Sequence, residues 1–515
     1  MPFSSAPNIL MIQADQMTAF ALGCYGQRAA QTPNLDRLAA EGVQFLNAYC
    51  NSPLCGPSRA SMVTGRMPSA IDSFDNANEL PASATTFMHV LRHAGYACWL
   101  SGKMHFVGPD QLHGFHGRTN TDIYPSSFQW TPDWRRGAYG NAGTSVHFLH
   151  QSGVCDWGLQ LDYDEETLAL GLRQMRDLVR RRARTGQPFF LCVSFTHPHD
   201  PYFIAPEYWS RIRESDVAPP AVPAMPLEAM HPYDRWLQIH HEIDRYPPSE
   251  QTILAARRAY LAMASYIDDK VGALLEETRR LGIERDTIVL FTSDHGDMQG
   301  EHGMWFKRTY FEGSMRVPLL FHGAGSIGGG RRIASPVSLV DLFPTLADLA
   351  GAPGDWPGAE ALDGSSLAPF LAGDRDSWDR PAICEYCGEG VTAPMRMARQ
   401  GDWKSVDVAG EAPLLFDLAS DPNETRNLAQ SPEAQALQAR LRQAALNGWD
   451  GEAMRRRILA DQQRRLFLYS AQLQGGAPAW DYQPYVDASR QYVREGFSTQ
   501  ETKRRERWPH VPDSV

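Results

Sequence analysis

Short apolar runs of strand length return after longer amphipathic stretches along most of this chain, and this alternation is the feature that most constrains its fold. A first buried run lies at 8–13, and three later runs each follow a helical pattern. The later runs are 96–101, 189–195 and 287–293, the helical patterns before them are 85–94, 164–184 and 250–281, and a further helix is expected over 32–42. Strands that recur after helices pair in parallel, because the helix carries the chain back across the sheet. The pattern predicts an α/β fold whose mostly parallel sheet is covered by helices.

The pattern of apolar and polar residues changes after about residue 375, where we expect a second, smaller subdomain. Short strands at 395–399, 403–408 and 414–418 suggest a small antiparallel sheet, and helical patterns follow at 432–447 and 451–472. The last stretch is rich in Trp, Tyr and Pro, so we expect it to dock on its own body or on a neighbouring subunit. The predicted division is a catalytic domain over 1–374, a C-terminal α+β subdomain over 375–479 and an extension over 480–515.

Charge balance and apolar run lengths argue against two classes of partner. Among 515 residues, 49 Lys and Arg stand against 60 Asp and Glu, and the net charge of −11 argues against a nucleic-acid binder that tracks phosphates. No apolar run reaches the roughly 18 residues that a membrane span needs. We predict no secretory signal, because no basic region precedes the short apolar stretch at 8–12, and the eight scattered Cys fit a reducing cytoplasm.

The C-x-x-C pair of Cys384 and Cys387 leaves two interpretations open. A redox or zinc pair has this spacing, but no second pair and no thioredoxin-like context accompany it. Two small buried strand residues are the plainer interpretation.

The segment from Cys55 to Arg66 carries the strongest chemical signal. Pro57 can open a helix at its first turn, so Cys55 lies beside a helix N-terminus, where backbone N–H groups and the dipole favour negative charge. Arg59 lies one helical turn further on the same face, so Cys55 and Arg59 can meet one anion. A buried Cys beside a helix cap would not explain why Cys, Pro, Ser and Arg occur together.

The motif Cys55-x-Pro-Ser-Arg59, followed by Thr64-Gly-Arg66, resembles the signature of the type I sulfatases, the formylglycine-dependent members of the alkaline phosphatase superfamily. The resemblance implies an alkaline-phosphatase-like fold, in which helices sandwich a mostly parallel sheet. It also implies that a formylglycine-generating or other sulfatase-maturating enzyme oxidises Cys55 to formylglycine. The hydrated aldehyde would then attack the sulfur of a sulfate monoester.

Acidic residues stand at the carboxyl ends of two predicted strands, where open α/β sheets place their sites. Asp15 ends the first strand, and Asp294 and His295 follow the run at 287–293. Carboxylates and one His suit a divalent cation, although either acidic strand end alone could be a helix cap. The resemblance implies metal ligation by Asp15, Gln16, Cys55, Asp294 and His295. Ca²⁺ is the favoured ion, and Mg²⁺ and Mn²⁺ stay open, because Gln16 stands where many sulfatases carry a second Asp.

Basic residues follow other predicted strands. Lys103 and His105 come after the run at 96–101, and His199 comes after the run at 189–195. Lysine is a compact charge that suits a sulfate oxygen, and His can move a proton near neutral pH. The resemblance implies a catalytic set: Cys55 as the nucleophile, Arg59 and Lys103 at the sulfate, His105 as the base, His199 and Lys307 at the leaving group, and Asn76 as a further polar contact.

Several segments, among them 102–115, 121–125 and 130–134, are similar to choline sulfatases, and the similarity continues to the last residues. The implied substrate is choline sulfate. A quaternary ammonium cannot donate hydrogen bonds, so aromatic faces and a carboxylate hold it. The candidates are Tyr124, Trp130, Trp134 and Glu385. The similar tail implies a homo-oligomer, a dimer or a tetramer, in which the extension contacts a neighbouring subunit and helps to close the active-site cleft.

Two other functions stay open. A related arylsulfatase, or a phosphonate monoester or phosphodiester hydrolase, would use the same nucleophile, because sulfate and phosphate esters share tetrahedral geometry. A sulfatase-like binding protein without catalysis belongs to a different class, and the complete set of charged residues around Cys55 speaks against it. We expect a small-molecule sulfate ester as the ligand, with no nucleic acid and no membrane as partner.

Overall fold

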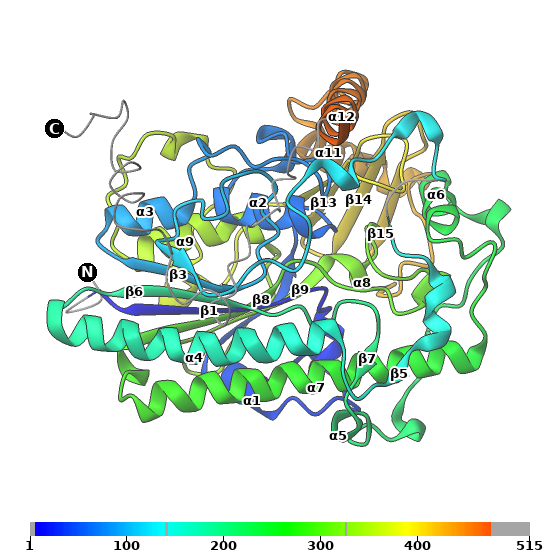
Figure 1. Ribbon diagram of the computed structural model, residues 1–515. Coiled ribbons are helices and arrows are strands. Elements are labelled where there is room, and N and C mark those ends of the chain that lie inside the picture. Colours follow the sequence, from blue (N-terminus) through cyan, green and yellow to red (C-terminus); the bar gives the residue numbers. More distant parts are fainter. Residues whose placement is uncertain (1–5, 140–142, 325–326, 475–515) are drawn as a thin grey trace, which may run out of the picture.

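The computed structural model describes residues 6–139, 143–324 and 327–474 (Figure 1). Within these residues the central sheet has nine strands, in the order β10-β2-β9-β8-β1-β6-β3-β4, with β11 paired to β2. The strands are β1 (Asn8–Ala14), β2 (Val43–Tyr49), β3 (Ala97–Gly102), β4 (Gly117–Arg118), β6 (Phe189–Ser194), β8 (Thr287–Ser293), β9 (Arg316–Gly323), β10 (Arg331–Ile333) and β11 (Val337–Ser338). The middle strands β8, β1, β6 and β3 pair in parallel, with Met11 beside both Leu290 and Cys192. The expected mostly parallel sheet is confirmed.

One strand of this sheet departs from the parallel pattern. β9 runs antiparallel to β8 on one side and to β2 on the other. The chain leaves β8 at Ser293, passes through an irregular segment and the short helix α8 (Glu312–Met315), and turns back into β9 at Arg316. An antiparallel neighbour needs no crossover helix. The loop that carries Asp294 and Lys307 is therefore held at both ends by neighbouring strands.

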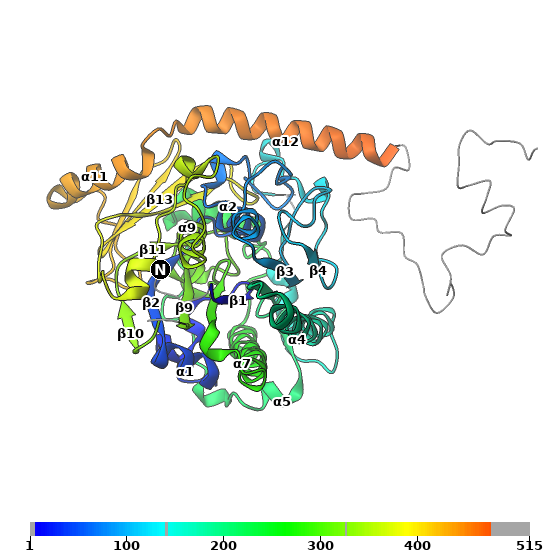
Figure 2. The same ribbon diagram turned by 90° about the vertical axis from the view of Figure 1, so that its left-hand side faces the viewer.

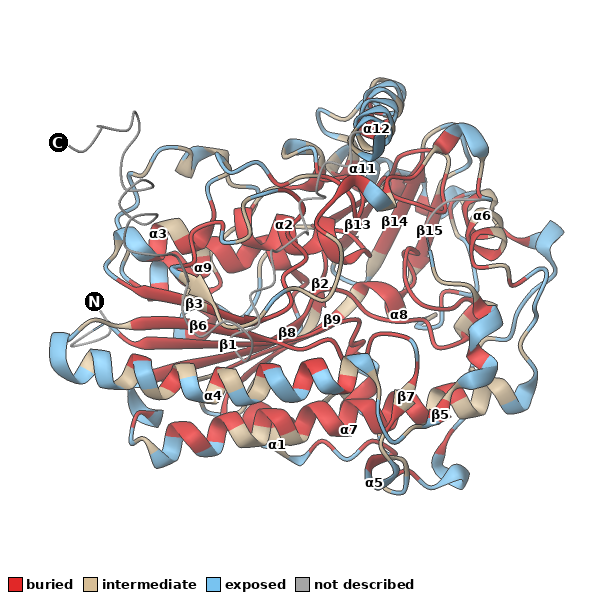
Figure 3. Cartoon of the chain, in the orientation of Figure 1, coloured by how far each residue is buried: buried red, intermediate tan, exposed pale blue. Residues whose placement is uncertain are grey.

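Helices cover both faces of the sheet (Figure 1). One face carries α1 (Pro33–Glu41), α4 (Leu159–Thr185) and α7 (Glu250–Arg280), and the other carries α2 (Cys55–Thr64), α3 (Phe87–His93) and α9 (Leu342–Leu349). Alternate residues of β1 enter two separate cores, Ile9 and Met11 on the side of α2, and Leu10 and Ile12 on the side of α7. The strands are buried on both faces, while the outer sides of α4 and α7 meet solvent (Figure 3).

Local signals explain where the long helices begin and end. The Ser249 side chain accepts a hydrogen bond from the N–H of Thr252 and caps α7. Gly186, with φ 73°, ends α4 in a left-handed conformation that glycine adopts without strain. The shorter elements are α5 (Pro206–Trp209), α6 (Pro232–His240), α10 (Ala368–Ala372) and the two-stranded pair β5 (Gly153–Val154) and β7 (Phe203–Ile204).

A second sheet follows the catalytic body in the chain. It is antiparallel, in the order β12 (Ala382–Tyr386), β13 (Met395–Gln400), β14 (Trp403–Val408) and β15 (Leu414–Asp417). Then come α11 (Gln435–Leu446) and α12 (Gly451–Gln474), and α12 lies across the top of the molecule (Figure 2). Cys384 and Cys387 are buried on and just after β12 with free thiols. The predicted extension over 480–515 lies outside the described residues.

No helix in the described part of the chain is long and apolar enough to cross a membrane.

Candidate active site

Cys55 is the first residue of α2 and points at the carboxyl ends of the central strands. Its Sγ lies 3.8 Å from Asp15 Oδ1, after β1, and 3.2 Å from His295 Nε2, after β8. No side chain caps the helix at Leu54, and the N–H of Gly56 donates to Asn76 Oδ1 at 2.8 Å. The structure thus brings together the helix N-terminus and the two acidic strand ends that the sequence suggested.

Arg59 joins the two acidic strand ends. Its Nε donates to Asp294 Oδ2 at 2.8 Å, and its Nη2 donates to Asp15 Oδ2 at 3.0 Å. Lys103 Nζ also pairs with Asp15. All four side chains are fully buried. Burial opposes the thiolate, but Lys103, Lys307 and His295 hold the pKa of the Cys55 thiol well below its usual range.

The same residues offer a set of metal ligands. One ligand atom each from Asp15, Cys55, Asp294 and His295 lies within 4.8 Å of the others, and all four side chains are buried. Carboxylate oxygens and an imidazole nitrogen are donors that suit a divalent cation. The donor set therefore fits the ion that the sequence pattern implies.

Gln16 lies next to this set and connects it to Lys307. The backbone of Gln16 is left-handed, with φ 63°, and its N–H donates to Asp294 Oδ1 at 3.0 Å. Its side-chain nitrogen donates to Asp200 Oδ1 at 3.1 Å and to Asp297 Oδ2 at 2.5 Å, and its side-chain oxygen accepts from Lys307. Gln16 thus connects the strand end at Asp294 to Lys307.

Lys307 and His199 form a pair at the same side of the site. His199 Nε2 lies 2.6 Å from Lys307 Nζ, and His199 Nδ1 lies 2.6 Å from the main-chain oxygen of Asp200. A lysine ammonium donates and does not accept, so this geometry assigns the ring proton of a neutral His199 to Nδ1. The pair can hold a proton between the two side chains.

His105 is oriented by a buried turn. Its backbone is left-handed, with φ 57°, and its ring lies 5.4 Å from that of Tyr124 and 5.8 Å from that of Trp130, between ring centroids. Asp122 Oδ2 accepts the N–H groups of Met104 at 2.9 Å and of His105 at 3.0 Å. Burial raises the pKa of Asp122, but Arg118, His105 and these N–H groups outweigh burial and hold it at about 2, so the carboxylate that fixes the turn stays charged.

A cavity of about 570 Å³ opens over Cys55. Among the predicted site residues, its lining includes Cys55, Asn76, His105, Tyr124, Trp130, His199 and Lys307. Asp15, Gln16, Arg59, Lys103, Asp294 and His295 lie beneath it, around Cys55. The cavity is thus polar at its floor and aromatic along one wall.

Two predicted substrate residues do not line this cavity. Trp134 Nε1 donates to the main-chain oxygen of Gly388 at 2.9 Å, and its ring belongs to the hydrophobic core. Glu385 accepts from the N–H and hydroxyl of Ser69 at 2.8 and 2.9 Å and pairs with Arg396 on the neighbouring strand. Both side chains satisfy their polar atoms inside the protein.

Three charged residues that sequence reasoning missed line the cavity: Asp200, Arg308 and Glu389. Arg308 Nη2 lies 3.0 Å from Glu389 Oε1, and both residues are 3% exposed. The Asn76 side chain reaches the same carboxylate at 3.5 Å. The position of Arg308 directly after Lys307 was a usable signal. Glu385 and Glu389 lie close together in the sequence, and no periodicity indicated which of the two lines the cavity.

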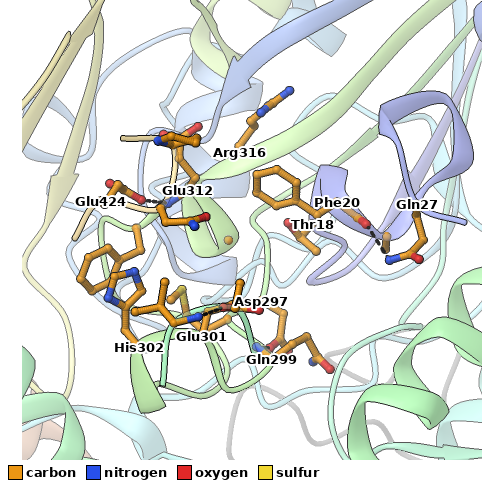
Figure 4. A pocket seen from close by; sticks show the side chains of 18 of the residues that line it. Thr18, Phe20, Gln27, Asp297, Gln299, Glu301, His302, Glu312, Arg316 and Glu424 are labelled. Atoms are coloured by element: carbon orange, nitrogen blue, oxygen red, sulfur yellow. Dashed lines mark hydrogen bonds between the residues drawn. The ribbon is translucent and has the colours of Figure 1, made fainter. Parts of the chain in front are cut away.

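A second cavity, of about 530 Å³, lies between the loop after β8 and the C-terminal sheet (Figure 4). Asp297 lines it and also accepts hydrogen bonds from Gln16 and Tyr202. On its other side, Glu312 and Glu424 both pair with the buried Lys404. None of the predicted site residues in the described part of the chain lines this cavity.

Comparisons with known proteins agree with this geometry. The family description "Sulfatase" matches residues 7–352. Two further descriptions follow along the chain: "N-sulphoglucosamine sulphohydrolase, C-terminal" matches residues 300–448, and "Choline sulfatase enzyme C terminal" matches residues 456–508. The matches therefore extend from the first strand into the C-terminal extension.

Individual relatives point the same way. The choline-sulfatase of Rhizobium meliloti is 40% identical over 517 residues, which cover 98% of each chain, and arylsulfatase K of Danio rerio is 31% identical over 82% of this chain and 80% of its own. The phosphonate monoester hydrolase of Agrobacterium radiobacter superposes with a TM-score of 0.68 at 25% identity, over 84% of this chain and 93% of its own. The alkaline-phosphatase-like fold is confirmed. The chain belongs to the sulfatase family, whose members are sulfuric ester hydrolases.

Proposed function

We propose that this protein hydrolyses choline sulfate to choline and sulfate, with formylglycine made from Cys55 as the nucleophile. The observation that carries the proposal is the position of Cys55. It stands at the N-terminus of α2, against Asp15 and His295, on the floor of a cavity with aromatic side chains in its wall. The 40% identity to the choline-sulfatase of Rhizobium meliloti supports choline as the alcohol.

Positive charge at the floor of the cavity prepares it for a sulfate group. A divalent cation, with Ca²⁺ favoured, would be held by Asp15, Asp294, His295, the side chain at position 55 and Gln16, and would supply Lewis-acid charge to a sulfate oxygen. The Arg59 guanidinium fixes both carboxylates by hydrogen bonds, and Lys103 adds a buried ammonium. These groups stabilise the charge that develops on the sulfate oxygens.

Protons are handled on two sides of the nucleophile. His105, which lines the cavity beside Cys55, is placed to take a proton from the side chain at position 55. Lys307, held by Gln16 and His199, is placed to give a proton to the departing alcohol. His199, with Nδ1–H on the Asp200 carbonyl, presents its Nε2 lone pair to Lys307 and so orients the ammonium that gives this proton.

Other lining residues of the cavity suit a quaternary ammonium. Tyr124, Trp130 and Trp157 offer aromatic faces, and the carboxylates of Asp200 and Glu389 offer negative charge. Trp157 lines the cavity and is 82% exposed. Tyr124 and Trp130 were predicted from the sequence, and Trp157, Asp200 and Glu389 take the place that Trp134 and Glu385 held in that prediction.

A comparison of three esters tests the proposal. We expect the highest kcat/KM on choline sulfate, a lower value on 4-nitrophenyl sulfate and a much lower value on a phenyl phosphonate monoester. The likeness to a phosphonate monoester hydrolase makes the third ester the natural rival. Preference for the phosphonate, or for the aryl sulfate, would replace choline sulfate as the substrate class.

The nucleophile is tested at position 55 itself. Peptide mass spectrometry should find formylglycine there, and Cys55→Ala should abolish turnover, while Cys55→Ser should retain a trace. The thermal unfolding midpoint of each variant serves as the control for folding. Turnover by Cys55→Ala at the rate of the parent protein contradicts the mechanism.

The remaining parts of the proposal concern organisation. The proposal also includes the division of the chain at residues 374 and 479. It includes a homo-oligomer, either a dimer or a tetramer, and a cytoplasmic location together with a sulfatase-maturating enzyme. The aromatic composition of 480–515 supports a role in a subunit interface that closes the cleft. A truncated protein that ends at residue 479 should lose the oligomeric state and bind substrate less tightly. Unchanged mass in solution and unchanged KM would contradict this part.

A further inference from the structure

One face of α12 packs against the rest of the protein, and the buried residues on this face change from apolar to polar along the helix. The buried residues recur at helical spacing: Met454, Ile458, Asp461, Gln462 and Arg465. The first two join the hydrophobic core, whereas the last three are polar. Buried polar groups need partners, because desolvation otherwise costs more than burial returns. The second half of α12 is therefore held by specific hydrogen bonds.

Arg465 is the centre of these bonds. Its Nη1 and Nη2 donate to the two carboxylate oxygens of Asp75 at 2.9 and 2.6 Å, and its Nε donates to Asp461 Oδ2 at 2.8 Å. The side chains of Arg465 and Asp75 are 3% and 0% exposed. The stability of a bidentate pair that is shielded from water depends on its geometry, because water cannot replace a hydrogen-bond partner that is out of place.

The first link from this pair leads to the nucleophile. Asp75 belongs to a tight turn in which Asn78 Oδ1 accepts the N–H groups of Phe74 and Asp75, and Asn78 Nδ2 donates to Asp461 Oδ2 at 2.9 Å. Asn76 lies in the middle of this turn. Its Oδ1 accepts the N–H of Gly56, the residue after Cys55, at 2.8 Å. The turn that α12 grips thus ends on the helix that carries the nucleophile.

The second link leads to the aromatic wall. Arg465 Nη1 also donates to Thr131 Oγ1 at 3.1 Å, and Gln462 Oε1 accepts the N–H of Trp134 at 3.0 Å. Thr131 follows Trp130, which lines the cavity and packs edge-on against His105. Residues about one turn apart on α12 therefore hold both loops that reach the cavity.

We infer that the polar half of α12 is a clamp on the active site, and that Arg465 is a positioning residue that fixes Asn76 and Trp130 in the cavity through Asp75 and Thr131. The inference rests on the proposed function, since it takes the cavity over Cys55 as the catalytic one. Arg465 itself does not line that cavity. Its effect on turnover passes through the two loops.

Kinetics and hydrogen exchange together test the clamp. Arg465→Gln removes the charge, and the double variant Asp75→Asn with Arg465→Gln removes both charges and leaves no unpaired Asp75. Arg464→Gln is the matched control, because Arg464 is the neighbouring arginine, its side chain is 70% exposed and it pairs with Asp461 on the same helix. We expect kcat/KM to fall at least tenfold in both Arg465 variants and to stay within twofold in the control.

Hydrogen exchange is measured on peptides from the two loops. Peptides that cover 72–80 and 126–135 should exchange faster in the Arg465 variants, while the α2 peptide over 55–64 should keep its protection. In an Asn76→Ala background, Arg465→Gln should cost a smaller factor in kcat than in the parent protein, because the two changes act along one path. Arg465→Lys should recover part of the loss by restoring the charge without the bidentate bond.

Two outcomes overturn the inference. One is a folded Arg465→Gln with parental kcat/KM, whether or not the loops exchange faster, because the contact would then be structural alone. The other is full additivity with Asn76→Ala, together with unchanged exchange in both loops. If the parent protein turns over 4-nitrophenyl sulfate and not choline sulfate, the proposed substrate fails, and the clamp is decided on the aryl ester and on exchange.

Discussion

Lys103 Nζ lies 4.1 Å from the centre of the Tyr124 ring, on the ring face. The same ammonium pairs with Asp15 at the floor of the site, and the same ring lies 5.4 Å from that of Trp130. Tyr124 therefore stands where the positive floor of the cavity meets its aromatic wall. One ring touches both the charge assigned to the sulfate and the surface assigned to the ammonium group.

Replacement of this ring should act on substrate binding. We expect Tyr124→Leu to raise the KM for choline sulfate about tenfold, because a cation over an aromatic face is worth on the order of 1 kcal/mol. Tyr124→Phe keeps the ring and should stay within about threefold. Steady-state kinetics on choline sulfate measure both. Equal losses in the two variants would assign the effect to the hydroxyl, which lies 3.3 Å from His199 Nδ1, and would contradict the cation site.

Lys307 should matter in proportion to how poor the leaving group is. Lys307→Met should lower kcat on choline sulfate by about 10² to 10⁴, because an alkoxide cannot depart without a proton. The loss on 4-nitrophenyl sulfate should be much smaller, since nitrophenolate is stable as an anion. Lys270→Met, a change at a lysine that pairs with Glu165 away from the cavity, is the control. Equal losses on the two esters would show that Lys307 does not serve the leaving group.

Removal of the metal should abolish the activity of the enzyme reversibly. Dialysis against a chelator should abolish turnover, and added Ca²⁺, Mg²⁺ or Mn²⁺ should restore it to a degree that identifies the working ion. Asp294→Asn should load less metal, because it gives up a charged oxygen of the buried ligand set. Metal content by mass spectrometry and activity are measured on the same samples. Full activity in a sample without metal would refute the site.

The pH dependence of stability should carry the signature of Asp234 in α6. Burial, with a smaller contribution from Glu424, raises the pKa of this carboxyl to about 7 despite a hydrogen bond from Tyr233. The folded state then holds the proton more tightly than the unfolded chain does, so the free energy of unfolding falls as pH rises from about 4 to about 7.

Asp234→Asn should remove this decrease in the free energy of unfolding. The variant should gain on the order of 2 kcal/mol relative to the parent protein at pH 8.5 and clearly less at pH 5, as measured by denaturant unfolding. Asp348→Asn, at an exposed carboxyl, should show no such difference between the two pH values. A gain for Asp234→Asn that is the same at both pH values would contradict the raised pKa.

The main elements of the fold could be read from the sequence because their signals are local. The strand expected at 287–293 and the one at 403–408 match β8 and β14 to the residue. Helix α4 begins at Leu159, earlier than the predicted 164, since its first turn has no side-chain cap to mark it. The antiparallel pairing of β9 was not foreseen, because the direction of a buried strand depends on the loop before it and leaves no periodicity in the strand itself.

The floor of the site was accessible to sequence reasoning for a related reason. Asp15, Lys103, His199 and Asp294 each follow a parallel strand, and the carboxyl ends of such strands converge at one edge. The walls come from irregular loops, in which side-chain direction has no repeat. Trp134 lies in such a segment and turns inward to Gly388, and Glu389 reached the cavity without a signal. Glu385 lies on β12 instead, and its side chain turns to Ser69.

The burial of α2 sets the order of events in the life of this protein. All ten residues of the helix are buried, and Cys55 is 1% exposed. A modifying enzyme must grip several residues of chain around its target, and the folded protein offers none of them. We therefore expect the oxidation that the family implies to precede the packing of α2, during or soon after synthesis. We expect a chain that folds first to keep Cys55 as a thiol out of reach of the modifying enzyme, and to be folded but inactive.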